Sequence, residues 1–135
     1  MADTFQLEIV TPERLVVKDS AEEMQLPAKN GYIGVMSGHA PLITELAVGE
    51  LTYLAQGYTE RLAISWGFAE VLPDKVTVLA ERAERAEEID VERAEEARQR
   101  AAERLNSGDP DMDYGRALVA LRRAEVRLEV AQKHK

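Results

Sequence analysis

Apolar and polar residues alternate along most of the first eighty positions, which is the pattern of half-buried β-strands. In the segment 5–10, Phe5, Leu7 and Ile9 are separated by Gln6 and Glu8. Similar short runs lie at 14–19, 21–26, 31–36, 42–46, 51–54, 58–64, 65–72 and 75–79, separated by turns rich in Gly, Pro, Asn and Asp. Roughly eight to ten short strands at this even spacing, with no helical pattern between them, predict an antiparallel β-sandwich or barrel rather than a parallel α/β sheet.

From residue 80 onward, helix-forming residues dominate the sequence. The segment 81–88 is highly charged and has no clear period, so we interpret it as a connector. Asp90 is a good N-cap, because its carboxylate can accept hydrogen bonds from the exposed N–H groups of the following turn. Its charge also suits the positive end of a helix dipole. A first helix is therefore predicted from Asp90 to about Leu105.

A second helix is predicted after a short break. The segment 106–110 contains Gly108, which suits a helix C-cap, and Pro110, which cannot continue a helix. Helix formers resume near Asp111 or Asp113, and so short a break favours an antiparallel hairpin. The predicted fold class is therefore α+β (β then α), with a β-sandwich domain at 1–86 and a helical hairpin at 87–135.

Both predicted helices carry an apolar stripe that is rich in alanine. The stripes comprise Ala94, Ala97, Ala101 and Leu105 on the first helix, and Tyr114, Ala117, Leu118, Leu121, Ala124, Leu128 and Ala131 on the second. Since burying one CH₂ group contributes only about 0.8 kcal/mol, a seam of alanines holds two helices together weakly. The hairpin could therefore detach or extend, although a hairpin that only stabilises the fold is an equally good interpretation.

Composition narrows the functional classes. The net charge of −8 disfavours nucleic-acid binding, which normally needs a basic face. The chain has no cysteine, and His39 and His134 lie far apart in the sequence, so no metal site is expected. The sequence lacks a P-loop, a nucleophile elbow and a Cys–His pair, so we expect no active site. It also lacks a signal-peptide pattern and any window of about 18 apolar residues, so no membrane span is expected.

Arginines are the residues most suited to bind a ligand. They lie along one side of each predicted helix: Arg93, Arg100 and Arg104 on the first, Arg123 and Arg127 on the second. In a folded hairpin these guanidinium groups can converge near Asp90 and repel one another unless an anion lies among them, and guanidinium is well suited to phosphate. The alternative is that each arginine pairs with a nearby carboxylate such as Glu96 or Glu103, and spacing alone favours this alternative.

Four runs of residues resemble a known protein family. They are Gly31-Tyr32-Ile33-Gly34-Val35-Met36-Ser37-Gly38-His39-Ala40-Pro41-Leu42, Gly49-Glu50-Leu51, Gly67-Phe68-Ala69-Glu70-Val71 and Val76-Thr77-Val78-Leu79-Ala80. With these runs the chain resembles the epsilon subunit of F-type ATP synthases, bacterial type, over nearly its whole length. One departure is Ser37, where many members have Pro, and it affects only the stiffness of a turn.

The resemblance implies a non-catalytic subunit of the central stalk. Such a subunit couples gamma to the membrane ring of c subunits, and its hairpin can extend toward the alpha/beta catalytic head and restrain ATP hydrolysis. The implied contact residues lie in sandwich loops: Lys29, Asn30, Gly31, Tyr32 and His39. From local chemistry alone, His39 is better interpreted as a residue that hydrogen-bonds within its own loop. The implied location is peripheral, on the cytoplasmic face of the bacterial inner membrane, held there only through the complex.

The resemblance also implies a nucleotide site, because some bacterial members bind ATP through a motif similar to Ile/Leu-Asp-x-x-Arg-Ala. The motif reads Ile89-Asp90-Val91-Glu92-Arg93-Ala94 in this chain. Further implied contacts are Glu84, Arg100, Arg123 and Arg127. The resemblance requires no cofactor, and a regulatory ATP is the one ligand that it implies. A free-standing ATP-sensing module with another protein partner is the alternative function.

Overall fold

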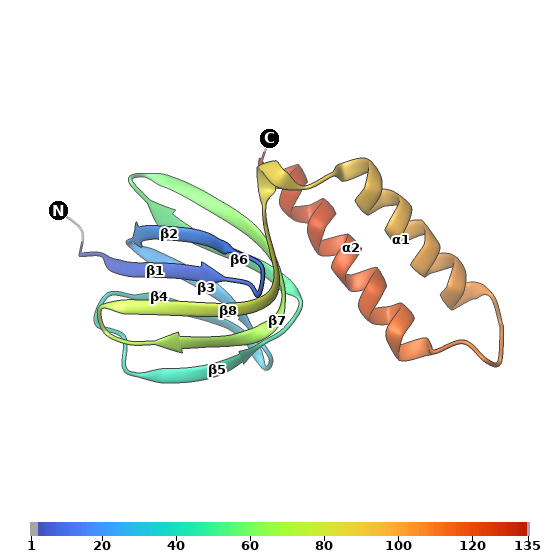
Figure 1. Ribbon diagram of the computed structural model, residues 1–135, viewed down its shortest axis with the longest axis horizontal. Coiled ribbons are helices and arrows are strands. Elements are labelled where there is room, and N and C mark those ends of the chain that lie inside the picture. The colour runs from blue at the N-terminus through green and yellow to red at the C-terminus, as the bar shows by residue number, and fades with distance from the viewer. Residues whose placement is uncertain (1–2, 135) are drawn as a thin grey trace.

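A computed structural model describes residues 3–134 of the chain, and within this range eight strands precede a short 3₁₀ helix and two α-helices (Figure 1). The strands are β1 (Phe5–Val10), β2 (Leu15–Ala21), β3 (Glu23–Ala28), β4 (Gly31–Met36), β5 (Leu42–Leu46), β6 (Gly49–Ala55), β7 (Tyr58–Val71) and β8 (Lys75–Arg85). The helices are η1 (Ala86–Glu88), α1 (Val91–Asn106) and α2 (Tyr114–His134). The predicted order of a β-sandwich followed by a two-helix hairpin is confirmed.

The strands form a two-layered sandwich, and the longest strands take part in both layers. The sheet order is β2-β1-β8-β7-β5-β3-β4, and β6 pairs with both β3 and β7. The first half of β7 pairs with β6 and its second half with β5. The prediction of an antiparallel sandwich is wrong for one pair, since β1 and β8 are parallel. β1 and β8 are neighbours in the sheet although they are the first and last strands along the sequence, so the whole chain between them serves as the crossover.

The two strands predicted at 58–64 and 65–72 form one continuous strand with a kink. Trp66 and Gly67 both have positive φ values, of 55° and 131°. A Cβ atom at Gly67 would lie 1.9 Å from the carbonyl oxygen of Leu79 on β8. The two backbones therefore approach each other more closely than any side chain allows, and β7 can bend from one layer into the other at this point.

The interpretation of 81–88 as a connector is wrong over most of its length, because β8 continues to Arg85. Residues 82–85 pair with residues 62–65 of β7 in an unbroken antiparallel register. The alternation was hard to recognise because Ala80 and Ala83 provide the buried positions, while charged residues provide the others. Glu84 therefore lies on a strand and not in a linker.

The sandwich core is aliphatic. Its fully buried large side chains include Leu7, Ile9, Leu26, Leu51 and Ile64, with Phe5 and Tyr53 as its aromatic members. Burial of such side chains contributes about 1.5–3 kcal/mol each, so this layer pair is the stable part of the molecule.

The two helices pack side by side, and α2 lies between α1 and the sandwich (Figure 1). The predicted alanine seam is confirmed by the burial of Ala94, Ala101, Ala117 and Ala124, whereas Ala131 is buried in an apolar cluster with residues of the sandwich. Two seam predictions are wrong: Tyr114 and Leu118 are 57% and 45% exposed. Both lie in the first turns of α2, where the chain has only just left the loop that joins the helices.

A second face of α2 docks the hairpin on the sandwich. Val126 and Val130 are buried in a small apolar cluster with Ala63 of β7, and with Ala86 and Ile89 of the junction before α1. The alanine stripe did not predict this face, because Val126 and Val130 lie outside it. Among the described residues, no helix combines the length and the apolar character needed to cross a bilayer.

Candidate functional site

A cleft of about 560 Å³ lies between the sandwich and the hairpin. Strands β7 and β8 form one wall, and α1 and α2 form the other. Small apolar side chains leave the space open: Val48, Ala63, Ala97, Ala120, Ala124 and Val126. The volume falls within the range of about 300–1,000 Å³ that is typical of small-molecule sites.

The cleft is strongly basic although the whole chain is acidic. Six arginines and three glutamates line it: Arg14, Arg82, Arg93, Arg100, Arg123 and Arg127, with Glu13, Glu81 and Glu84. The chain as a whole carries a net charge of −8. A concave surface with an excess of one charge concentrates ions of the opposite sign, so the cleft favours a small anionic ligand.

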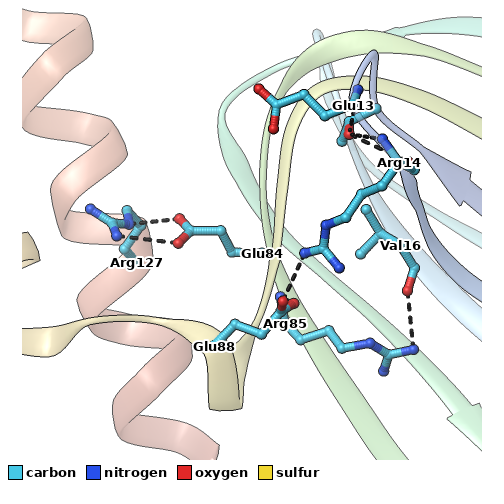
Figure 2. A network of polar contacts seen from close by, with 8 residues as sticks. Glu13, Arg14, Val16, Glu84, Arg85, Glu88 and Arg127 are labelled. Atoms are coloured by element: carbon cyan, nitrogen blue, oxygen red, sulfur yellow. Dashed lines mark hydrogen bonds and ion pairs between the residues drawn. The ribbon is translucent and has the colours of Figure 1, made fainter.

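Arg127 of α2 is held against the sandwich by Glu84 of β8, as Figure 2 shows. Its Nη2 donates a hydrogen bond to Oε2 of Glu84 at 3.2 Å. Its Nε lies 2.7 Å from Oε1, close enough for an ion pair but without the alignment of a hydrogen bond. This contact joins the two domains across one end of the cleft.

Arg14 pairs with Glu88, but the remaining four cleft arginines lack such a partner among the described residues. Among the residues that the structure describes, Arg82, Arg93, Arg100 and Arg123 form no ion pair. The alternative, in which nearby carboxylates such as Glu96 or Glu103 pair with the arginines, therefore holds for Arg127, which pairs with Glu84, and not for these four.

Arg123 lies in the least favourable surroundings. Its Nε is buried without a hydrogen-bond partner. Burial lowers the pKa of the Arg123 guanidinium, Arg82 lowers the pKa further by like-charge repulsion, and Glu81 opposes both effects. Because arginine stays charged in proteins, this position is a partly buried cation that an anion in the cleft would stabilise.

The predicted motif 89–94 divides into one cleft residue and three structural residues. Arg93 lines the cleft. Asp90 is confirmed as the N-cap of α1, since its Oδ1 accepts from the backbone N–H of Arg93 at 3.1 Å. Ile89 and Ala94 are 8% and 0% exposed and pack within the protein. These three residues fix the start of α1, and thereby the direction in which Arg93 enters the cleft.

The chain is also anchored just before this motif. Glu88 forms an ion pair of 2.7 Å with Arg14 in the β1–β2 turn (Figure 2). Arg85 donates to the carbonyl of Val16 at 3.3 Å. Residues up to Glu88 therefore belong mechanically to the sandwich, and a hinge for the hairpin would lie at Ile89 and Asp90.

Other predicted site residues lie as follows. Glu84, Arg100, Arg123 and Arg127 line the cleft together with Arg93, whereas Arg104 does not. Arg104 shares the helix face of Arg93, but it lies eleven residues further along α1, which is a distance of about 16 Å. Figure 1 shows α1 running away from the sandwich in that direction.

The predicted partner-contact residues are not one cluster. Lys29, Asn30, Gly31 and Tyr32 lie at the turn where β4 begins, and His39 follows its end. Six strand residues span about 20 Å, so the two groups lie at opposite ends of β4. The Nδ1 of the partly buried His39 lies 2.7 Å from the carbonyl oxygen of Ala40, which matches the local hydrogen bond expected for a loop histidine.

Sequence reasoning missed two cleft arginines. Arg82 is on the part of β8 that was interpreted as a connector, and Arg14 is far from the hairpin in the sequence. One signal was available in the sequence. Arg82 and Glu84 are two residues apart on either side of Ala83, and residues at this spacing share one face of a strand.

Comparison with known proteins gives the family. Residues 4–86 match the model of the β-sandwich domain of the ATP synthase delta/epsilon chain, and residues 87–132 match its long α-helix domain. The chain is 66% identical over 111 residues to the ATP synthase epsilon chain of Koribacter versatilis, covering 82% of this chain and 78% of the relative. It is 47% identical over 133 residues to that of Solibacter usitatus, covering 98% and 99% of the two chains.

Solved structures show the same fold. A chain of the mitochondrial ATP synthase of Euglena gracilis, in an assembly of OSCP, F1 and c-ring, superposes with a TM-score of 0.82 at 26% identity, covering 96% of this chain and 81% of that chain. By the match of both domains and by its bacterial relatives, the chain belongs to the family of epsilon subunits of F-type ATP synthases.

Proposed function

We propose that the chain is a non-catalytic subunit of the central stalk, which couples gamma to the c-ring and contacts the alpha/beta head of a bacterial ATP synthase. Family membership over residues 4–132 supports the stalk role. The structural relative from Euglena gracilis belongs to an assembly that contains F1 and the c-ring. The chain then lies peripherally at the cytoplasmic face of the inner membrane, attached through the complex.

We further propose that the hairpin inhibits ATP hydrolysis when it leaves the sandwich, and that bound ATP holds it on the sandwich. The observation that carries this proposal is the basic cleft between the two domains, where four arginines of β8, α1 and α2 form no ion pair with any described residue. A triphosphate between them would replace mutual repulsion with charge-assisted hydrogen bonds. ATP would therefore favour the compact conformation.

The energies are of the right size for a switch. Few contacts dock the hairpin on the sandwich: a small apolar cluster around Val126 and Val130, and two ion pairs of a kind that contributes about 0–1 kcal/mol where it is exposed. A ligand that binds only the docked form stabilises it by about 2.7 kcal/mol at a concentration of one hundred times its Kd. Such a shift changes a roughly balanced equilibrium into one that is almost entirely docked.

The test of ATP control is a titration of the isolated chain with ATP, followed by X-ray scattering. The radius of gyration should fall as ATP binds, and Arg93→Gln should abolish the fall. Arg116→Gln is a matched control, because Arg116 is exposed on α2 and does not line the cleft. Unchanged scattering at millimolar ATP would remove ATP control and leave the stalk role.

Inhibition needs a separate test in the assembled enzyme. An ATP synthase whose epsilon subunit lacks residues 91–135 should hydrolyse ATP faster than one with the full chain. Equal rates in the two complexes would contradict the inhibitory role of the hairpin.

A further inference from the structure

Strand β8 presents two charged side chains to α2. A strand directs alternate side chains to opposite faces, so Arg82 and Glu84 share one face while Ala83 points into the sandwich core. Glu84 contacts Arg127 of α2. Arg82 must therefore face the same helix, and it lines the same cleft.

The two charged residues of β8 are spaced to match two arginines of α2. Two strand residues span about 6.6 Å, and the four residues from Arg123 to Arg127 span about 6 Å along the helix. Glu84 lies against Arg127 with opposite charge. Arg82, two residues before Glu84 on β8, lies toward Arg123, which has the same charge. Arg82 therefore lowers the pKa of the Arg123 guanidinium. One contact is complementary and the other is repulsive.

Both cations in the repulsive contact lack a carboxylate partner among the described residues, and Nε of Arg123 is buried and unsatisfied. Glu81 is near enough to influence Arg123 but forms no ion pair with it. Two guanidinium groups that line the same cleft can both donate to one phosphate group between them.

We infer that Arg82 of the sandwich is a phosphate-binding residue, which together with Arg123 holds a phosphate group of the nucleotide between β8 and α2. The inference rests on the proposed function in taking ATP as the ligand. The inference also explains how ATP would hold the hairpin on the sandwich. ATP bound only by helix arginines would join α1 to α2, whereas ATP that also contacts Arg82 joins the hairpin to the sandwich.

The decisive variant is Arg82→Gln, because it should change two quantities in opposite directions. Without ligand, its melting temperature should equal or exceed that of the unmodified chain, since a like charge beside Arg123 is removed. Its affinity for ATP, measured by titration calorimetry, should fall about tenfold. A merely structural Arg82 would show the reverse, with a lower melting temperature and an unchanged affinity, and that result would overturn the inference. Arg116→Gln makes the same change of charge outside the cleft and should alter neither quantity.

Two titrants separate this inference from the proposed function. ATP and inorganic triphosphate should each be titrated into the unmodified chain, Arg82→Gln and Arg93→Gln. Loss of ATP affinity in Arg93→Gln but not in Arg82→Gln would overturn the inference and keep ATP control. Binding of triphosphate but not of ATP, with loss in Arg82→Gln, would keep the phosphate-binding role of Arg82 and remove ATP as the ligand. Binding of neither compound to the unmodified chain would overturn both.

Discussion

Lys133, in the last turn of α2, forms an ion pair of 3.2 Å with Glu50 of β6 in the sandwich. The Glu50 side chain is only 14% exposed, and the same Oε1 atom also lies 3.3 Å from Arg61. The hairpin is therefore tethered near its C-terminal end as well as at the cleft, where Arg127 meets Glu84. Two charge contacts and one valine cluster hold α2 on the sandwich.

Replacing Glu50 should release one tether. Glu50→Gln removes the charge that both Lys133 and Arg61 contact in a largely buried position, and we expect a loss of about 1.5–3 kcal/mol in the free energy of unfolding. Urea unfolding measures this loss. Glu45→Gln is the control, because Glu45 pairs with Lys29 in a half-exposed site and should cost less than about 1 kcal/mol. Equal losses would show that Glu50 is no tether.

Replacing Glu84 should loosen α2 in a way that ligand corrects. Glu84→Gln leaves Arg127 without its carboxylate, so amide hydrogen exchange in α2 should speed up by about tenfold, which corresponds to about 1.4 kcal/mol. At saturating ATP the difference from the unmodified chain should shrink, because phosphate can replace the lost partner. Glu129→Gln is the control, since its pair with Arg122 is half-exposed and spans 3.7 Å. If amide hydrogen exchange in α2 of Glu84→Gln stays equally faster with ATP bound, phosphate does not replace the lost carboxylate.

Gly67 should tolerate no side chain. Gly67→Ala places a Cβ atom 1.9 Å from the Leu79 carbonyl oxygen at a φ of 131°, and we expect a loss of about 3 kcal/mol or more. Thermal unfolding measures it. Gly57→Ala is the matched control, because Gly57 also has positive φ, 82°, but open space around it, so only about 1–2 kcal/mol of backbone strain is expected. Similar losses for both variants would mean that β7 and β8 can separate at the kink.

The sequence predicted most strands and both helices because their periods are local properties. Asp90 marked the start of α1, and the alternation in Phe5–Val10 marked β1. The end of β8 was missed because Ala80 and Ala83 bury too little to show a strong period, and its outer face is charged to meet the arginines of α2. A strand face that serves a site does not follow the usual division into apolar core and neutral surface.

The candidate site was predictable only in part, for a similar reason. Helix periodicity places Arg93 and Arg100 on one face, but it cannot place Arg82 opposite Arg123, which depends on how α2 packs on the sandwich. Periodicity also grouped Arg104 with the site although it lies beyond the reach of β8. The docking residues Val126 and Val130 lie outside the predicted apolar stripe, because α2 has two buried faces and the stripe describes only one of them.

The valine cluster should control docking without affecting the sandwich. Val130 is fully buried against the sandwich side of α2, so Val130→Ala should weaken docking by about 2 kcal/mol and increase the radius of gyration of the chain without ligand. Leu118→Ala removes a larger side chain from the same helix, but Leu118 is 45% exposed and should leave the radius unchanged. Because compaction by ATP draws on the same equilibrium, Val130→Ala should also weaken apparent ATP binding, although Val130 lies outside the cleft lining. Equal scattering curves for Val130→Ala and the unmodified chain would show that charge contacts alone hold the hairpin.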